Sequence, residues 1–284
     1  MLAIDIRNLN KKYPNFQLRD VSFQLEKGYI MGFIGANGAG KTTTIRSILN
    51  MIHIDSGEVR ILGKNVAEHE IELKQEIGYA FGGFEFYTRS KIKTLTDVIK
   101  KFYANWNEET YHSYLRRFKL DENKKVAELS TGMKVKYSLA LALSHGAKLV
   151  ILDEPTSGLD PVARDDLLDI FQELVLDGEI SILFSTHITS DLEKCADYIT
   201  FIDNGQIIAS SEKHEFMEAY RLLSGSESQL NQVKAQLISY KINSFGFTGL
   251  IRAKDFDPST NLKAATPSLE EIMIYFAKKE DAYV

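Results

Sequence analysis

The feature that most constrains this chain of 284 residues is a short glycine-rich turn that ends in Lys41 and Thr42. Residues 29–34 before it form an apolar run with the length and β-favouring composition of a buried strand. Gly35, Gly40, Lys41 and Thr42 fit the spacing G-x-x-x-x-G-K-[ST], in which glycines let successive backbone N–H groups converge on a phosphate. A helix predicted to begin at about Lys41 adds the positive end of its dipole.

The residues of this turn have separate expected roles. Lys41 is expected to reach the β and γ phosphates of a nucleotide, and the Thr42 hydroxyl is expected to ligate Mg²⁺. Further phosphate contacts are expected along the turn, from Gly35, Asn37, Gly38, Ala39, Gly40 and Thr43. The plainer alternative is an incidental lysine in a strand-to-helix turn, which the match in strand-before-helix context disfavours.

An acidic pair at the end of another apolar strand supplies a second part of a nucleotide site. Residues 149–152 read Leu-Val-Ile-Leu and lead directly into Asp153 and Glu154. Asp153 is expected to hold Mg²⁺ through water, and Glu154 is expected to orient or deprotonate an attacking water. Solvated loop charges are the alternative, which the preceding phosphate loop disfavours.

Charge, cysteine content and hydropathy limit the class of protein. A net charge of -5 and a pI of about 5.8 give no global basic field for nucleic acid, although a local basic strip stays open. Cys195 alone cannot form an internal disulfide, which fits a reducing cytosol, and an ordinary partly buried thiol is the expected state. Asp5 and Arg7 argue against a signal peptide, and the longest apolar patches fall far short of the about 20 residues of a membrane span. We expect a cytoplasmic protein that needs other chains for any membrane function.

Hydrophobic periodicity predicts an α/β chain that begins with an antiparallel pair. Residues 3–9 and 17–25 alternate apolar and polar side chains around a turn at 13–15, and a short strand follows at 57–62. Residues 84–147 are charged and helical in period, and so predict a helical insertion. The apolar side chains of that period are Leu95, Val98, Ile99, Phe102, Tyr111, Tyr114, Leu115 and Phe118.

Alternating strands and helices after this insertion predict a parallel sheet covered by helices. The predicted strands are 149–152 and 180–185, with a helix at 162–176 between them. Residues 198–202 and 206–209 flank an Asp-Asn-Gly sequence that favours a hairpin. The expected fold class is therefore α/β, with a mixed sheet, an antiparallel β subdomain and a helical insertion.

No nucleotide motif recurs beyond about Ser211, so we expect a small α+β domain at 212–284 after a main domain at 1–211. Its expected elements are a short segment at 220–223, a polar helix at 226–237, a β-like run at 247–252 and a closing helix at 268–278. Ser268 followed by Glu271 predicts a capping box for the last helix.

Over residues 1–211 the motifs together resemble those of the ATP-binding subunits of ABC transporters. Residues 129–133, Leu-Ser-Thr-Gly-Met, are similar to the signature sequence of that family, 157–160 to its D-loop and His187 to its switch histidine. Tyr13 lies where the family places an aromatic residue that stacks on adenine. Taken singly, Tyr13 could be a core tyrosine and His187 a structural histidine. The order of all the motifs along the chain, however, matches the family.

The resemblance implies a P-loop NTPase fold of the ABC ATPase type and Mg²⁺-dependent ATP hydrolysis. Lys41 would act in catalysis with Glu154 as general base and His187 as γ-phosphate sensor. In the family two protomers sandwich two ATP molecules head to tail, so the signature and Asp160 would contact ATP held by the second protomer.

The signature also fits that role on physical grounds. Ser130 and Gly132 precede a helix predicted from Met133 to about Ser144, so a hydroxyl and backbone N–H groups gather at a positive helix end. We expect Ser130, Gly132 and Met133 to contact a γ-phosphate. The alternative is that residues 129–133 form only a helix N-cap and contact no second protomer.

The chain departs from the family pattern at two places. Thr131 and Met133 stand where the family usually has glycine and glutamine, although Thr131 still offers a backbone N–H. Gly82 stands near the position of a glutamine that binds Mg²⁺ and senses the membrane partner in the family. The role of this glutamine would be lost, passed to water or taken by a neighbour such as Glu85. Our hypothesis is that water completes the coordination of Mg²⁺.

The resemblance further implies an export function. Residues 160–164 and 185–193 and the short C-terminal domain are most similar to ATPases of bacterial exporters of antimicrobial peptides, drugs or amphipathic peptides. The implied partners are transmembrane permease subunits, which dock on the helical insertion at the inner face of the membrane, and a second ATP-binding protomer of the same or a similar chain. A soluble ABC-type ATPase and a regulatory nucleotide-binding module with weak turnover stay open as alternatives.

Overall fold

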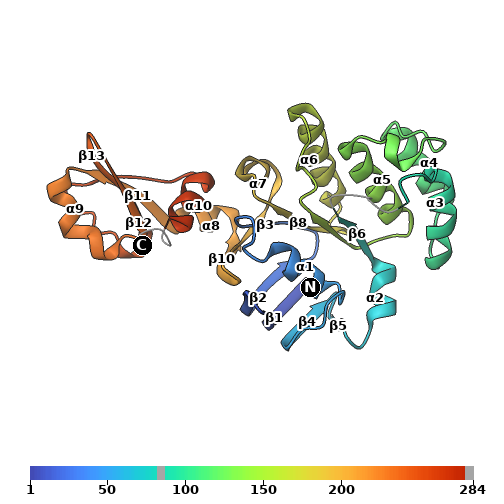
Figure 1. Ribbon diagram of the computed structural model, residues 1–284, viewed down its shortest axis with the longest axis horizontal. Coiled ribbons are helices and arrows are strands. Elements are labelled where there is room, and N and C mark those ends of the chain that lie inside the picture. Colours follow the sequence, from blue (N-terminus) through green and yellow to red (C-terminus); the bar gives the residue numbers. More distant parts are fainter. Residues whose placement is uncertain (82–86, 279–284) are drawn as a thin grey trace. The chain divides into compact units, whose positions relative to one another are not determined.

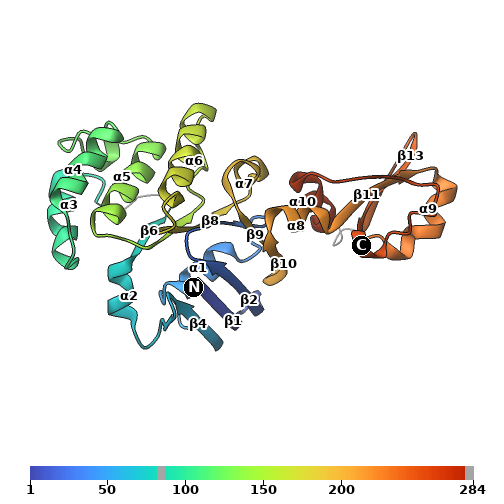
Figure 2. The ribbon, with the colours of Figure 1, turned by 180° about the vertical axis from the view of Figure 1, so that it is seen from behind.

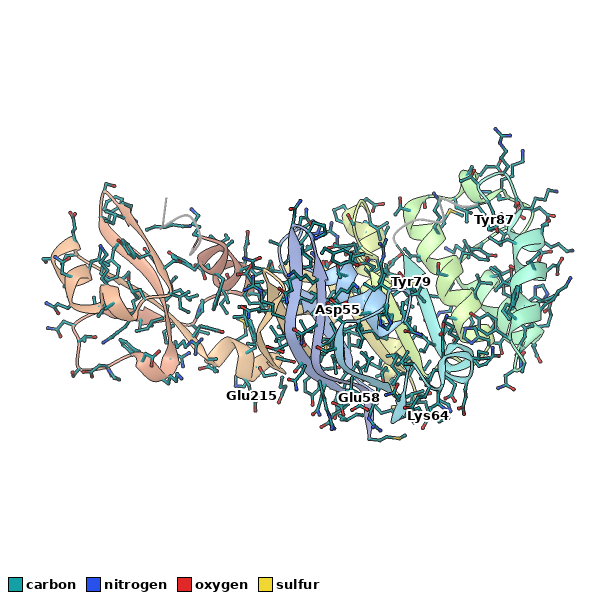
Figure 3. All side chains as sticks on the ribbon, turned by 60° about the horizontal axis from the view of Figure 1, so that its bottom comes forward. Asp55, Glu58, Lys64, Tyr79, Tyr87 and Glu215 are labelled. Carbon is teal, nitrogen blue, oxygen red and sulfur yellow. The ribbon has the colours of Figure 1, made fainter. Side chains whose placement is uncertain are left out.

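The alternating N-terminal segments form an antiparallel sheet. In the computed structural model, which describes residues 1–81 and 87–278, β1 (Leu2–Tyr13) pairs with β2 (Phe16–Glu26) and β4 (Ser56–Ile61), and β5 (Lys64–Asn65) follows β4 in the sheet. Charged side chains of this region, among them Asp55, Glu58 and Lys64, are labelled in Figure 3. They form ion pairs with Lys11, Arg60 and Glu72, respectively. The predicted antiparallel start is confirmed.

The glycine-rich turn and the acidic pair belong to a second, mainly parallel sheet with the order β10-β9-β3-β8-β7-β6. Its strands are β3 (Ile30–Ile34), β6 (Ile77–Phe81), β7 (Leu149–Asp153), β8 (Ser181–Thr186), β9 (Tyr198–Asp203) and β10 (Gln206–Glu212). β3 pairs in parallel with β8 and β9, and β7 pairs in parallel with β6 and β8. Asn204 and Gly205, with φ of 44° and 74°, form the predicted hairpin turn between β9 and β10. The α/β fold with a mixed sheet is confirmed.

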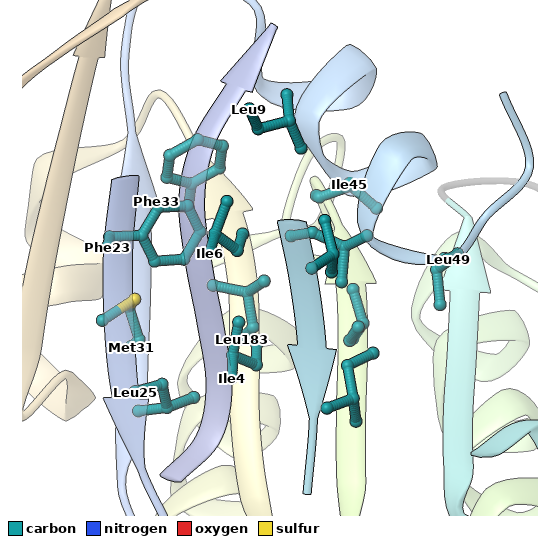
Figure 4. Close-up of a cluster of buried hydrophobic side chains, with 14 of the residues drawn as sticks. Ile4, Ile6, Leu9, Phe23, Leu25, Met31, Phe33, Ile45, Leu49 and Leu183 are labelled. Carbon is teal, nitrogen blue, oxygen red and sulfur yellow. The ribbon is translucent and has the colours of Figure 1, made fainter. Parts of the chain in front are cut away.

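The hydrophobic core lies where the antiparallel sheet, the parallel sheet and α1 (Lys41–Ile48) meet (Figures 1 and 4). The rings of Phe23 on β2 and Phe33 on β3 stack with centroids 5.5 Å apart. Around them pack Ile4, Ile6, Leu9, Leu25, Met31, Ile45, Leu49 and Leu183. Full burial of one such side chain contributes about 1.5–3 kcal/mol, so the strand and helix that flank the glycine-rich turn are held firmly.

Helices cover both faces of the parallel sheet (Figures 1 and 2). α1 lies on the face toward the antiparallel sheet, and α6 (Pro161–Val175) and α7 (Thr189–Cys195) lie on the opposite face. α7 approaches β3 closely, because a Cβ on Gly32 would come within 2.0 Å of Leu192 Cδ2. α2 (Glu70–Glu76), which the sequence did not predict, leads into β6.

The stretch with helical period contains α3 (Ile92–Ile99), α4 (Glu108–Arg117) and α5 (Thr131–Ser144), with 3-10 turns at Lys100–Phe102 and Val126–Glu128. The Thr96 hydroxyl lies 2.8 Å from the hydroxyls of Tyr111 and Tyr137, so a buried polar cluster joins these helices. Phe102 lies beyond the end of α3 and is exposed, whereas the pattern had placed it on the helical apolar face.

The chain divides into two compact units, Met1–Ile208 and Ala209–Val284. The second unit has a sheet of order β12-β13-β11-β14 with its own apolar cluster around Leu223, Phe247 and Ile251. Its elements are α8 (Lys213–Glu218), β11 (Tyr220–Gly225), α9 (Glu227–Val233), β12 (Ser239–Asn243), β13 (Gly246–Arg252), β14 (Lys263–Ala265) and α10 (Leu269–Ala277). The predicted capping box is present, since Ser268 accepts from Glu271 N and the Glu271 carboxylate accepts from Ser268 N.

Some of the second unit was not predicted. α9 ends at Val233, and a 3-10 turn at Lys234–Gln236 continues the predicted helical segment to near residue 237, but the strand β12 that follows was not predicted. β12 reads Ser-Tyr-Lys-Ile-Asn, lies at a sheet edge and exposes Ile242. Its alternation of polar and apolar side chains covers only five residues, which is a weak signal for a strand. Throughout residues 1–81 and 87–278, no helix combines the length and apolar character that a membrane span requires.

Candidate functional site

The glycine-rich turn connects β3 to α1, and two of its glycines have no room for a side chain. A Cβ on Gly35 would lie 2.4 Å from Ile202 O. Gly40 precedes α1 with φ of 115°, and a Cβ there would lie 2.9 Å from Phe16 Cζ. Both positions therefore require glycine, which leaves the backbone open toward a ligand.

Lys41 is buried inside this turn, with 6% of its surface exposed. Its Nζ donates to Gly35 O at 2.8 Å and to Ala36 O at 3.3 Å, and it lies 3.1 Å from Glu154 Oε1. The ammonium group is thus surrounded by oxygen atoms. Phosphate oxygens of a ligand would offer it an equivalent set of acceptors.

The acidic pair ends β7, and β8 orients it. Asp153 lies opposite Ser185 in the strand register, and the Ser185 hydroxyl donates to Asp153 Oδ1 at 2.5 Å. The same hydroxyl accepts from Glu154 N at 2.9 Å. The sequence reasoning missed Ser185 as a site residue. The alignment of two strand ends at one sheet edge was the available signal.

Glu154 brings the catalytic candidates together. Its Oε2 lies 2.8 Å from His187 Nδ1, while its Oε1 faces Lys41 Nζ. Its backbone has φ of 51°, a left-handed conformation that costs a residue with a side chain about 1 kcal/mol or more. The Ser185 hydrogen bond to Glu154 N helps to maintain this conformation.

Thr42 and Asp153 also meet, since Thr42 Oγ1 donates to Asp153 Oδ2 at 2.8 Å. A hydroxyl and a carboxylate are hard oxygen ligands of the kind that Mg²⁺ accepts, together with waters and phosphate oxygens. Within the part of the chain that the structure describes, no group of three or more His, Cys, Asp or Glu side chains could hold a metal ion. The residues therefore fit Mg²⁺ bound jointly with a nucleotide rather than a metal held by the protein alone.

A cavity of about 520 Å³ opens over the turn. Its lining residues are Asn15, Phe16, Asn37, Gly38, Gly40, Lys41, Thr42, Thr43 and Glu154. Asn15 and Phe16 were not predicted. They come from the β1–β2 turn, where Phe16 is the cross-strand neighbour of Tyr13.

Several predicted residues lie outside that lining set, among them Gly35, Asp153 and His187 as well as Tyr13 and Ala39. Tyr13 is 38% exposed, and Lys11 Nζ lies 5.6 Å from the centroid of its ring. Ala39 is buried, and its carbonyl accepts from Gly205 N at 2.9 Å, which anchors the turn to the β9–β10 hairpin.

The signature residues lie at the start of α5 and do not line this cavity of their own chain. Ser130 is the N-cap, and its hydroxyl accepts from Met133 N at 3.3 Å. Gly132 is buried, and a Cβ there would lie 3.3 Å from Leu159 Cδ2 of the predicted D-loop. Asp160 caps α6 and accepts from Val162 N and Ala163 N, both at 3.0 Å.

Gly82 and Glu85 lie outside the described residues. The hypothesis that water completes the Mg²⁺ ligands at Gly82 therefore stays a prediction.

Comparisons with known proteins agree with this geometry. A family model described as "ABC transporter" matches residues 18–157. The ABC transporter ATP-binding protein YtrB of Bacillus subtilis is 35% identical over 218 residues, which cover 76% of this chain and 74% of that protein. The bacitracin transport ATP-binding protein BcrA of Bacillus licheniformis is 33% identical, over 72% of this chain and 68% of that protein. A solved ATP-binding subunit of an ABC transporter superposes with a TM-score of 0.66 at 27% identity, over 75% of this chain and 91% of that one.

Proposed function

Since the chain belongs to the family of ATP-binding subunits of ABC transporters, whose members hydrolyse ATP to power transport, we propose that Glu154 and His187 carry out Mg²⁺-dependent hydrolysis at the cavity over Lys41. The observation that carries this proposal is the placement of Glu154 between Lys41 and His187, at 3.1 and 2.8 Å. A carboxylate in such a position can accept a proton from water next to a phosphate held by the lysine.

The chain's own groups suggest how the reaction proceeds. The γ-phosphate of ATP would attract Lys41 Nζ away from the loop carbonyls and from Glu154 Oε1. Glu154 would then accept the proton of the water that attacks the γ-phosphorus, while the bond to the bridging oxygen of ADP breaks. His187 Nδ1 would keep the carboxylate oriented from its other oxygen. Mg²⁺, held by Thr42 and Asp153, would neutralise charge on the phosphates.

We include a second protomer in the proposal. Ser130, Gly132 and Met133 do not line the cavity of their own chain, and Ser130 caps α5 with an exposed side chain. An α-helix N-terminus favours anions, so a head-to-tail dimer would place this end against the γ-phosphate of the other protomer. Asp160 would approach the nucleotide in the same dimer.

ATP-binding subunits of this family work with transmembrane permease components. We place the docking surface beside the helical insertion, where a groove of about 800 Å³ runs along residues 67–72 and 101–104. Ile71 and Phe102 at this groove are 84% and 72% exposed, so they offer apolar surface to a docking partner. The protein would then act at the inner face of the membrane.

For the cargo we propose export of peptides or drugs. The similarity to the bacitracin transport ATP-binding protein BcrA supports this proposal, because that relative is named for the transport of bacitracin. The stretches 160–164 and 185–193 support export through their resemblance to exporter ATPases.

The variant Glu154→Gln tests the proposed chemistry, because the amide keeps the shape but loses the basic oxygen. Turnover of ATP should fall about 100-fold or more, while the affinity for ATP changes little and an ATP-bound dimer accumulates in size-exclusion chromatography. Glu109→Gln, an exposed glutamate in the first turn of α4, is the matched control and should turn over normally. Normal turnover by Glu154→Gln would remove Glu154 from this role.

A further inference from the structure

A buried carboxylate on α7 connects the chain segments that carry Glu154 and His187. Asp191 is 1% exposed, and its Oδ2 accepts from the Thr156 hydroxyl at 2.6 Å. Thr156 is fully buried and lies two residues after Glu154. Asp191 lies four residues after His187, in the first turn of α7. The hydrogen bond therefore joins the same two segments that meet at the Glu154–His187 contact.

The other oxygen of Asp191 faces α6. Arg164 Nε lies 3.9 Å from Asp191 Oδ1, which is too long for a hydrogen bond. Both atoms are buried, and neither has a hydrogen-bond partner among the described residues. Burial raises the pKa of Asp191, against the smaller lowering effects of Thr156 and Arg164. A buried carboxylate with one unsatisfied oxygen is costly to keep, so its presence calls for an explanation other than stability.

A second hydrogen bond, from Glu154 N to the Ser185 hydroxyl at 2.9 Å, also joins the segments around this carboxylate, on the strand side of Glu154. Ile188 N donates to the Thr186 hydroxyl at 2.9 Å, which sets the start of the turn into α7. Glu154 has the left-handed φ of 51°, and the chain after it turns through Thr156 toward Asp160 and α6. The Asp191–Thr156 bond holds the chain that follows Glu154, so its loss would remove the anchor on that side and let the Glu154 carboxylate shift relative to His187.

We propose that Asp191 is a positioning residue for ATP hydrolysis, which acts through Thr156 to keep the Glu154 carboxylate in contact with His187. The inference rests on the proposed roles of Glu154 and His187. Displacement of a catalytic group by about 1 Å can lower a rate about 100-fold, whereas ATP binding depends on the separate loop of Gly35 to Thr43. Loss of the Asp191–Thr156 bond should thus reduce kcat and spare the affinity for ATP.

Double-mutant analysis on the full chain tests this inference. Asp191→Ala and Thr156→Val should each lower kcat about tenfold or more, with the Kd of a fluorescent ATP analogue changed less than about twofold. The double variant should be no slower than the slower single variant, because both remove one shared interaction. Thr156→Ser keeps the hydroxyl and should restore kcat to within about threefold of the native chain.

Asp169→Ala is the matched control, because it weakens the contact between α6 and α7 without touching the Asp191–Thr156 bond. Asp169 forms an exposed ion pair with Lys194 of α7 at 2.7 Å, away from Thr156 and Glu154. This variant should leave kcat within about twofold. If Asp191→Ala does not fold, the comparison of Thr156→Val with Thr156→Ser carries the same test.

The possible outcomes separate the two proposals. Additive losses in kcat, a parallel loss of ATP affinity, or a native kcat in Thr156→Val would overturn the role of Asp191 while Glu154→Gln stays inactive. Native turnover by Glu154→Gln would instead refute the proposed function, and the role of Asp191 would fall with it.

Discussion

The N-termini of α1 and α6 differ in whether a side chain of the protein accepts hydrogen bonds from their first backbone N–H groups. The first N–H groups of any helix lack partners within that helix. In α6 the Asp160 carboxylate accepts from Val162 N and Ala163 N, both at 3.0 Å. In α1 the preceding residue is Gly40, and neither a side-chain cap nor an acidic residue in the first turn is present in this fully described helix. The helix end that has no side-chain cap is therefore the more available of the two to a phosphate.

The N-terminus of α5 lies between these cases. Ser130 accepts from Met133 N, but at 3.3 Å the bond is longer than usual. A phosphate of another protomer could compete for this end more easily than for the end of α6. The following variants test this order of availability to phosphate among the N-termini of α1, α5 and α6, and the cavity beside α1. They are given from the largest expected effect to the smallest.

Gly40→Asp would give α1 the kind of cap that α6 has. The new carboxylate would repel phosphate, and its Cβ would meet Phe16 Cζ at 2.9 Å, so ATP affinity should fall about 100-fold or more in a fluorescence titration. Gly63→Asp is the matched control, because Gly63 also has positive φ, 82°, but has no atom within 4 Å of its Cβ. A similar loss of affinity in both variants would attribute the effect to backbone strain alone.

Ser130→Ala should reduce ATP turnover about 10- to 100-fold, because a hydrogen bond to a charged oxygen contributes about 1.5–3 kcal/mol. The ATP affinity of the isolated chain should stay unchanged, since Ser130 does not line its own cavity. Ser268→Ala removes a comparable N-cap, that of α10, and should leave turnover intact. Equal turnover of the two variants would argue that Ser130 is a cap only.

Phe16→Ala should weaken ATP binding about tenfold, since stacking of a base on an aromatic ring contributes about 1–3 kcal/mol. Phe16 lines the cavity and lies over Gly40, whereas Tyr13 is its cross-strand neighbour outside the lining set. Tyr13→Ala should therefore change the affinity less than about threefold in the same titration. The reverse order of the two effects would restore Tyr13 as the adenine-stacking residue.

Asp160→Ala should lower the free energy of unfolding by about 1 kcal/mol through loss of the α6 cap, as measured by urea denaturation. Asp160→Ser should recover most of that stability. ATP affinity of the isolated chain should not change in either variant. A loss of turnover far beyond the loss of stability would show that Asp160 also contacts nucleotide.

The predictable parts of the fold were those with local causes. The phosphate loop, the acidic strand end and the capping box at Ser268 follow from residue types at fixed spacing, and each lies where those spacings predict. β12 and α2 were missed, because an edge strand of five residues and a charged helix of seven are too short for a strong periodic pattern. Elements were thus predicted where burial imposes periodicity on the sequence or where a turn or cap has characteristic residues.

The sequence by itself determined which residues could take part in nucleotide chemistry, since the types and spacing of Gly40, Lys41, Asp153 and Glu154 predict such roles. Only the tertiary structure decided which distant residues serve them. Ser185 and Phe16 reach the site because parallel strand ends share one edge of the sheet and a hairpin turn folds over Gly40. Asp191 meets Thr156 for the same reason, because the packing of α7 against the sheet brings together residues that are 35 positions apart in the chain.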